Sequence, residues 1–231
     1  MKRILLYFTN KYFGEWEKIY YALSDKEVVP KKYYENTKLL PNYISVIDKN
    51  YPDELKTIYK PPFSLFWYGN FDLLSKKMIG VYGYSNDKNI IDNILKLKKA
   101  VYVVDYNNSK LINLLMKNNI NFICIYKNGI DNKMKNSKIY SKIINSNNLI
   151  ITEIPSNNST NIFIDQMHNR IIFGLSKIMI FLDDNDKYSF ESIIQICKLE
   201  SISCYSYKKL SNDYLISIND INKIICQRLS N

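Results

Sequence analysis

The chain has 231 residues, enough for one large domain with a substantial core or for one domain with a small extension. Its 32 basic and 22 acidic residues give a net charge of +10, which favours a polyanionic partner such as nucleic acid or anionic lipid. Lysine, asparagine, isoleucine and tyrosine are abundant and share AT-rich codons, so the positions of the charges must decide whether the excess reflects binding or codon usage.

Cysteine spacing and apolar run length exclude two further classes of protein. The four cysteines form no CxxC pair and have no metal-like spacing, so we expect reduced core thiols and no disulfides. The apolar runs are shorter than the ~20 residues of a membrane span, and no signal-peptide cleavage site follows the N-terminus. We therefore expect a cytoplasmic protein with no membrane partner.

The first part of the chain is predicted to be a small helical segment. Apolar residues recur at helical spacing over residues 1–25, and Gly14 interrupts them, so the pattern favours two short helices. Residues 26–43 are polar, rich in lysine and contain Pro30 and Pro41. This change in composition predicts a boundary between an N-terminal segment, 1–43, and a larger domain, 44–231.

From about residue 44 onward, short β-branched runs alternate with amphipathic stretches. The predicted strands are 43–48, 64–69, 76–83, 100–105, 121–126, 149–153, 177–183 and 201–207. The predicted helices lie between 52 and 61, from a cap at Ser85 or Asn86 to 97, from a cap at Ser109 to 118, and over 138–145, 163–175 and 188–200. This alternation indicates an α/β fold, with a doubly wound, mostly parallel sheet covered by helices on both faces.

Right-handed crossovers place the carboxyl ends of parallel strands along one edge of the sheet, where open α/β sheets bind ligands. The segments expected there are 83–85, Asp105, 127–129, 152–153 and 183–184. The first combines a strand, a glycine and a helix start, which could form either a phosphate cradle or a plain tight turn.

Catalytic constellations are nearly absent. His168 is the one histidine, and the chain has neither a GxSxG elbow nor a GxxxxGK[ST] loop. The aspartates 183, 184 and 186 could hold Mg²⁺ but are more typical of a solvated capping loop, and Glu153 has no visible partner for general-base chemistry. We expect no catalytic residue, no metal and no cofactor.

Arg170 is the one arginine in the central 200 residues of a chain whose other basic residues are nearly all lysine. Its retention indicates a planar, bidentate contact that lysine cannot replace. The target could be a phosphate group or an internal carboxylate, and the sequence leaves both open.

Several segments together resemble the DprA family, also called Smf. YPDELKTIYKPPFSLFWYGNFDLL is similar to the opening motif of the family, and FIDQMHNRIIFGLS is similar to its FPxRNRIIAGLS segment. VYGYS, ICIYKNGID and LIITEIP resemble further family segments, and the whole resemblance covers residues 44–206. The chain departs from the family where Ser85 and His168 replace arginines, where Met134-Lys135 replaces a Tyr-Pro pair, and where two glycine-rich segments are reduced.

The resemblance implies an extended Rossmann-like domain and a non-enzymatic protein that binds single-stranded DNA and hands it to a RecA-type recombinase in DNA uptake or recombination. A homodimer is a further partner that we consider. Bases could stack on Tyr82, Tyr84 and Tyr126. The predicted nucleic-acid-binding residues are Gly83, Tyr84, Ser85, Asn86, Lys127, Lys133, Lys135, His168, Asn169 and Arg170.

Two other interpretations compete with this one. The first is an interaction protein that keeps the fold without DNA affinity, which the reduced glycine segments favour. The second is a nucleotide phosphoribohydrolase of a related Rossmann group, although the PGGxGT loop of those enzymes is absent from the chain.

Overall fold

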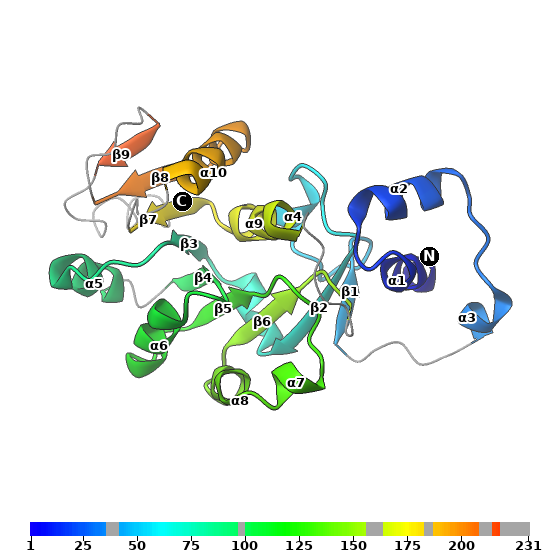
Figure 1. Ribbon diagram of the computed structural model, residues 1–231, viewed down its shortest axis with the longest axis horizontal. Coiled ribbons are helices and arrows are strands. Elements are labelled where there is room, and N and C mark those ends of the chain that lie inside the picture. Colours follow the sequence, from blue (N-terminus) through cyan, green and yellow to red (C-terminus); the bar gives the residue numbers. More distant parts are fainter. Residues whose placement is uncertain (36–41, 97–99, 156–163, 183–186, 208–213, 218–231) are drawn as a thin grey trace.

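The computed structural model describes residues 1–35, 42–96, 100–155, 164–182, 187–207 and 214–217 (Figure 1). These residues form a nine-stranded sheet in the order β1-β2-β6-β5-β4-β3-β7-β8-β9. The strands are β1 (Tyr43–Ser45), β2 (Ser64–Gly69), β3 (Met78–Tyr82), β4 (Val101–Asp105), β5 (Phe122–Ile125), β6 (Leu149–Thr152), β7 (Ile178–Phe181), β8 (Ser203–Ser206) and β9 (Leu215–Ser217).

The strand order reverses at β3, which makes the sheet doubly wound. Strands β4, β5 and β6 follow β3 in one direction, whereas β7, β8 and β9 lie on its other side, and all these pairings are parallel. The β1–β2 and β2–β6 pairings are antiparallel. The predicted α/β class with a mostly parallel sheet is therefore confirmed. The two antiparallel pairings lie at the edge of the sheet nearest the N-terminal helices.

Helices cover both faces of the sheet, as Figure 1 shows. Helices α5, α6 and α8 lie on one face, and α4, α9 and α10 lie on the other. Alternate residues of β4 serve the two layers: Val101 and Val103 pack with α9, whereas Tyr102 and Val104 pack with α6. The helices of the sheet domain are α4 (Asp53–Lys56), η1 (Phe71–Ser75), α5 (Lys88–Leu95), α6 (Ser109–Lys117), α7 (Asn132–Lys135), α8 (Lys138–Asn145), α9 (Ile164–Leu175) and α10 (Lys187–Leu199).

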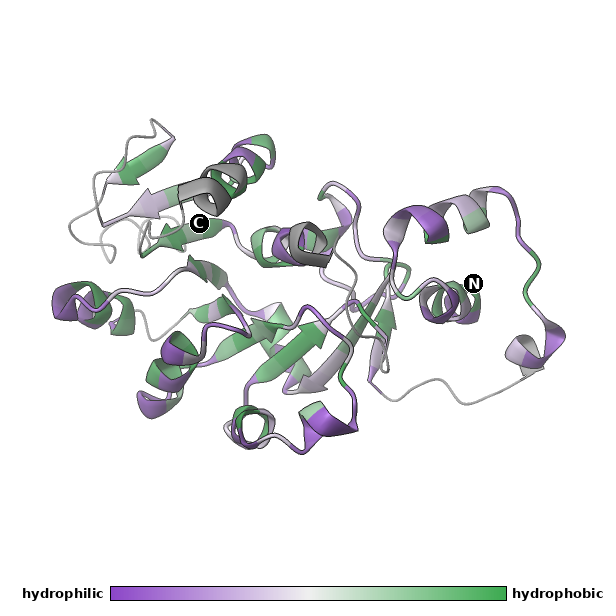
Figure 2. Ribbon diagram, in the orientation of Figure 1, coloured by the Kyte–Doolittle hydropathy of each residue, from purple (hydrophilic) through white to green (hydrophobic). Residues whose placement is uncertain are grey.

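Most predicted elements lie within a few residues of the observed ones, because the strands are continuous apolar runs and the helices have one apolar face. In Figure 2 the central strands β4, β5 and β6 are largely green, which marks hydrophobic residues, whereas β2 and β8 are paler. Two helix starts differ from prediction: Asp87 and Asn108 are the N-caps of α5 and α6, where we expected Ser85 or Asn86 and Ser109. Strand β9 was not predicted, because it is short and half to fully exposed.

The N-terminal helices α1 (Lys2–Lys11), α2 (Trp16–Ser24) and α3 (Lys31–Glu35) gather at the β1 end of the sheet (Figure 1). They share a small core around Phe8, Ile19, Ala22 and Val29. The two predicted helices before residue 25 are confirmed, and Gly14 lies between them with a φ of +77°. Gly14 also presses against the end of β6, because a Cβ there would stand 3.0 Å from the main-chain oxygen of Glu153.

The state of the cysteines and the apolar content of the helices bear on two expectations from the sequence. Cys124, Cys197 and Cys204 are buried and free, as predicted, and Cys226 lies outside the described residues. Burial raises the pKa of the Cys124 thiol well above its usual value. Among the described helices, none has the length and apolar content needed to cross a bilayer.

We predict that Gly14→Ala lowers the free energy of unfolding by about 1–2 kcal/mol, because a side chain at positive φ is strained and the added Cβ meets the Glu153 carbonyl. Thermal denaturation should then show a melting temperature lower by about 2–8 °C. Asn10→Ala, at an exposed position of α1, is the control and should change the free energy of unfolding by less than about 0.5 kcal/mol. An unchanged melting temperature for Gly14→Ala would show that the α1–α2 turn does not need this backbone conformation.

Candidate nucleic-acid interface

The carboxyl ends of β3, β4, β5 and β6 lie side by side, and hydrogen bonds join the loops that follow them. The Asn108 Nδ2 group donates to the Gly83 oxygen at 2.7 Å, which links the loops after β3 and β4. The Thr152 hydroxyl donates to the Asn128 oxygen at 2.9 Å, which links the ends of β5 and β6. These bonds assemble four of the five predicted loop segments into one edge, and residues 183–184 lie outside the described residues.

The turn after β3 is a helix cap and not an open phosphate cradle. Gly83 has a φ of +79°, which turns the chain sharply after the strand. The hydroxyl of buried Ser85 accepts a hydrogen bond from the Asp87 amide at 3.1 Å. The Asp87 carboxylate in turn accepts hydrogen bonds from the amides of Asn89 and Ile90. Since a carboxylate already occupies the positive end of α5, an additional anion is disfavoured there.

Asn86 and Tyr84 are the parts of this turn that face outward. Asn86 is exposed, and Tyr84 is half-buried with the Lys110 ammonium 5.4 Å from its ring centroid. Ser85 is buried and engaged in the turn, so its predicted contact with nucleic acid is not supported. The capping roles of Asn108 and Asp87 were not predicted, although the runs YNNS and Ser-Asn-Asp both contain side chains that commonly cap helices.

His168 pairs with Asp105 behind the sheet edge. Its Nε2 atom lies 3.0 Å from Asp105 Oδ2, its side chain is buried, and its Nδ1 atom has no hydrogen-bond partner among the described residues. Burial opposes ionisation of Asp105, but the His168 contact, the Asn107 amide and the charge of Lys127 outweigh it and lower the pKa of this carboxyl. The burial of His168 leaves its predicted contact with DNA unsupported, while Asn169 beside it is half-buried.

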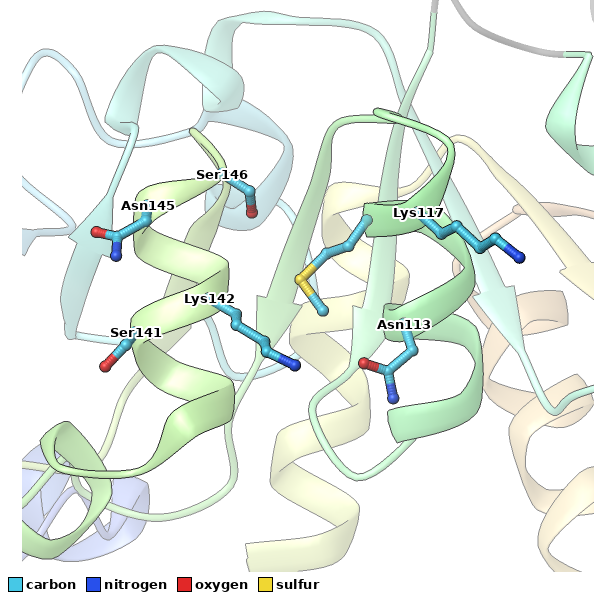
Figure 3. Close-up of a pocket in the computed structure, with 7 residues that line it drawn as sticks. Asn113, Lys117, Ser141, Lys142, Asn145 and Ser146 are labelled. Carbon is cyan, nitrogen blue, oxygen red and sulfur yellow. The ribbon is translucent and has the colours of Figure 1, made fainter.

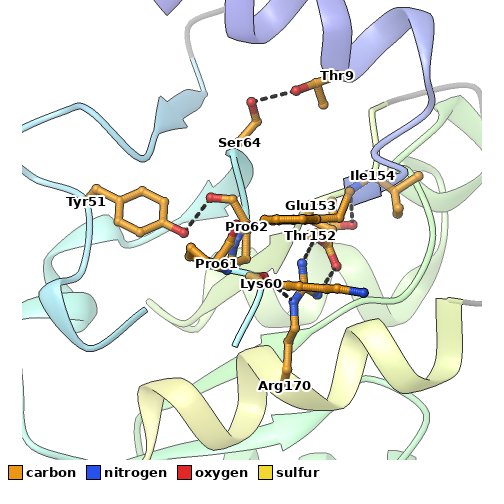
Figure 4. Close-up of polar contacts among 11 residues, drawn as sticks. Thr9, Tyr51, Lys60, Pro61, Pro62, Ser64, Thr152, Glu153, Ile154 and Arg170 are labelled. Atoms are coloured by element: carbon orange, nitrogen blue, oxygen red, sulfur yellow. Dashed lines mark hydrogen bonds and ion pairs between the residues drawn. The ribbon is translucent and has the colours of Figure 1, made fainter. Parts of the chain in front are cut away.

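Arg170 contacts an internal carboxylate (Figure 4). Its Nη1 and Nη2 atoms donate to the two carboxylate oxygens of Glu153, each at 2.6 Å, and its Nε donates to the Lys60 oxygen at 2.7 Å. Both side chains are less than one-tenth exposed. Of the two targets that the sequence left open, the structure has the internal carboxylate, which gives Arg170 a structural partner, and its predicted contact with nucleic acid stays a prediction.

The Arg170–Glu153 pair influences neighbouring groups. Burial, followed by the charge of Glu153, raises the pKa of Tyr51 far above its usual value. The Tyr51 hydroxyl donates instead to the Pro62 oxygen at 2.7 Å. The pair and this bond hold the loop of Lys60, Pro61 and Pro62 against the carboxyl end of β6 (Figure 4).

The remaining predicted cations, Lys127, Lys133 and Lys135, follow β5. Lys127 is half-exposed, while Lys133 and Lys135 are exposed on α7. The Lys135 ammonium lies 5.1 Å from the centroid of the Tyr68 ring. Two predicted stacking residues are half-buried against neighbouring rings: Tyr126 meets Tyr106 at 4.7 Å, and Tyr82 meets Phe181 at 6.0 Å. This part of the edge offers positive charge and ring edges to a ligand.

No group of three or more histidine, cysteine, aspartate or glutamate side chains that could hold a metal ion occurs within the described part of the chain. The aspartates at 183, 184 and 186, which the sequence analysis considered for Mg²⁺, fall outside it. Glu153 has the partner that the sequence did not reveal: both of its carboxylate oxygens accept hydrogen bonds from Arg170.

Fold and edge together define a doubly wound, Rossmann-like protein with a lysine-bearing carboxyl edge. Sequence comparison matches residues 42–98 to the family described as DNA recombination-mediator protein A. No curated protein sequence matches the chain. DNA processing protein A (DprA) from Streptococcus pneumoniae has a similar structure, with a TM-score of 0.65 and 16% identity over 98% of this chain and 92% of that one.

DNA processing protein A from Helicobacter pylori is similar with a TM-score of 0.64 and 16% identity, over 81% of this chain and 96% of that one. That protein is described as having a unique mode of binding single-stranded DNA. The resemblance to the DprA family predicted from the sequence is confirmed, by the sequence match over residues 42–98 and by the fold.

We predict that Arg170→Ala lowers the free energy of unfolding by about 3–5 kcal/mol, because it leaves the Glu153 carboxylate buried without its partner. Urea denaturation should show this loss directly. The double variant Arg170→Met/Glu153→Leu should recover part of it, because no unpaired charge then remains. Lys177→Met, an exposed charge just beyond the same helix, is the control and should have little effect. Equal stability of Arg170→Ala and the control would contradict the bracing role.

Proposed function

We propose that this protein is a recombination mediator that binds single-stranded DNA at the carboxyl edge of its sheet. The observation that carries the proposal is the cluster of Lys127, Lys133 and Lys135 beside the assembled strand ends, in a fold shared with DprA proteins. Lysines at such an edge neutralise phosphates and release counterions, which supplies sequence-independent affinity. Asn86 adds an exposed amide next to the same edge.

Single strands suit this edge better than duplex DNA. Tyr84 and Tyr126 are half-buried at the strand ends, so one side of each ring is supported by protein and the rest can meet an unpaired base. Stacking on such rings contributes about 1–3 kcal/mol per base and tolerates any sequence. A helix that could enter the major groove of a duplex is not among the described elements at this edge.

The partners in this proposal are single-stranded DNA and a RecA-type recombinase, to which the DNA is transferred, with a homodimer as the assembly that brings two edges together. The protein acts by binding alone. Support for a non-enzymatic role comes from Glu153, whose carboxylate is held by Arg170, and from His168, whose ring is buried against Asp105.

We predict that the protein binds labelled single-stranded oligonucleotides more tightly than duplexes of the same length. The salt dependence of binding is measured by fluorescence anisotropy between about 0.05 and 0.2 M salt. Each phosphate contact with single-stranded DNA contributes ~0.7 to the steepness of log affinity against log salt. The loss of three lysines in Lys127→Gln/Lys133→Gln/Lys135→Gln should therefore make this slope shallower by about 2. The control removes the same charge from exposed lysines near the N-terminus, Lys31→Gln/Lys32→Gln/Lys49→Gln, and should keep the wild-type slope.

Equal affinity for single strands and duplex would argue against the edge as a site for unpaired bases. Absence of binding to either form would favour the competing interpretation, an interaction protein that keeps the fold without DNA affinity. Addition of a RecA-type recombinase to DNA covered by single-strand-binding protein tests the transfer step separately, since filament assembly should accelerate only when the mediator binds DNA.

We also predict no release of base or phosphate when the protein is incubated with nucleotides, nucleoside monophosphates or DNA in the presence of Mg²⁺, as measured by chromatography of the products. Glu153→Gln serves as the matched variant. Activity that depends on Mg²⁺ and disappears in Glu153→Gln would establish an enzyme of the phosphoribohydrolase kind instead.

A further inference from the structure

Much of the net positive charge of the chain lies in residues 106–148, where acidic residues are nearly absent. Residues 106–148 contain seven lysines and one aspartate, with no arginine or glutamate, so they hold +6 of the net charge of +10. Residues 1–60 have a similar density of basic residues, 11, but 8 acids, and hence a net charge of +3. Codon usage can raise the number of lysines, but it does not explain why residues 106–148 have one acid whereas residues 1–60 have eight.

This stretch forms one side of the molecule. It contains α6, α7 and α8, which lie together on the lower face in Figure 1. An open groove of about 550 Å³ runs between α6 and α8. Lys142 of α8 and Asn113 of α6 extend toward each other across it, whereas Lys117 extends past the outer side of α6 (Figure 3). The groove is lined by Asn113, Met116, Lys117, Ser141, Lys142, Asn145 and Ser146.

The groove is separate from the proposed site at the carboxyl edge. Helix α6 begins at Ser109, just after the carboxyl end of β4, and Lys117 is in its last turn, about 12 Å further along the helix axis. Asn145 and Ser146 lie at the end of α8, immediately before β6 begins. The groove therefore extends from the middle of the helical layer toward the opposite edge of the sheet.

The lining chemistry selects a phosphate backbone as the occupant. Ammonium, amide and hydroxyl groups are the donors that proteins use on phosphate oxygens, and the lining includes no acid. Among the described residues, neither Lys117 nor Lys142 forms an ion pair. Both lysines are exposed and available to a ligand.

Two other polyanionic or acidic partners fit less well. A membrane surface or a protein partner needs apolar anchors, and the exposed large hydrophobic side chains among the described residues all lie outside 106–148. They occur on the N-terminal helices, in the α4 region and near α10 and β9. The α6–α8 side offers charge and hydrogen bonds, and the one apolar side chain in the groove lining, Met116, is half-buried.

We propose that the groove between α6 and α8 is a second contact for the phosphate backbone of single-stranded DNA. This inference rests on the proposed function, since a strand bound at the carboxyl edge continues past α7 and over the groove. Short oligonucleotides fill the edge alone, and longer ones also occupy the groove. The length of DNA therefore determines whether Lys117 and Lys142 contribute to affinity.

The test compares wild-type protein with Lys117→Gln/Lys142→Gln, using oligonucleotides of about 6 and about 25 nucleotides, one near the lower end of the ~4–16-nucleotide site size of an OB fold and one well above it. The variant should bind the short oligonucleotide like wild type and the long one about tenfold more weakly, with a salt slope smaller by about 1.4. Lys31→Gln/Lys32→Gln on α3 is the matched control and should bind both lengths like wild type. Melting temperatures verify that all variants fold.

The outcomes separate the two proposals. If wild-type protein binds neither oligonucleotide, the proposed function fails and the groove proposal fails with it. If wild-type protein binds both, but the Lys117/Lys142 variant retains full affinity and slope for the long one, the groove proposal alone is overturned. Co-sedimentation with vesicles made of equal parts phosphatidylglycerol and phosphatidylcholine distinguishes lipid phosphate from DNA. If the Lys117/Lys142 variant loses vesicle binding but still binds the long oligonucleotide like wild type, the groove proposal is also overturned.

Discussion

The ion pair between Arg170 and Glu153 holds together four parts of the chain that are far apart in sequence. Arg170 is on α9, Glu153 follows β6, and the Arg170 Nε group also fixes the Lys60 oxygen in the loop before β2. The turn at Gly14 packs closely against the Glu153 main-chain oxygen, since a Cβ added at Gly14 would lie 3.0 Å from it. A buried carboxylate is tolerated only with a cation and hydrogen bonds in place, so the positions of α9, of that loop and of the N-terminal helices are interdependent.

Because Arg170 is paired with Glu153, lysines and not arginine supply the outward positive charge at the carboxyl edge of the sheet. Two basic side chains that the sequence pattern placed at the ligand edge have internal partners: Arg170 pairs with Glu153, and His168 Nε2 lies 3.0 Å from Asp105 Oδ2. The outward charges are lysines on flexible stems. An ammonium group binds phosphate as a point charge without the bidentate geometry of arginine. The edge is therefore suited to sequence-independent, salt-sensitive contact with a backbone, and not to recognition of particular bases.

Charge distribution connects the edge with the rest of the molecule. The net charge of +6 on residues 106–148 extends from the strand ends over α7 to α6 and α8, and it arises because this stretch contains a single acid, Asp131. In the N-terminal segment, by contrast, acids pair with lysines, as Glu27 does with Lys11 and Glu17 with Lys60. One side of the protein thus has a sustained positive potential, which is the electrostatic requirement for binding a long polyanion.

Most elements of the sheet domain, and their order, could be predicted from the sequence, whereas β9 could not. Runs such as LIIT and VYVVD are continuous and apolar because parallel strands are buried on both faces, and amphipathic stretches between them can only be covering helices. The sequence also contained the lysines of the edge and the segment, residues 42–98, that matches the family described as DNA recombination-mediator protein A. Only the tertiary structure decided which polar groups face solvent. Whether Arg170 reaches a phosphate or Glu153, and whether His168 meets a ligand or Asp105, depends on contacts between residues 17 to 110 positions apart. Local spacing carries no information on such contacts, because the partner of a side chain on α9 is set by the segments that the fold brings to it.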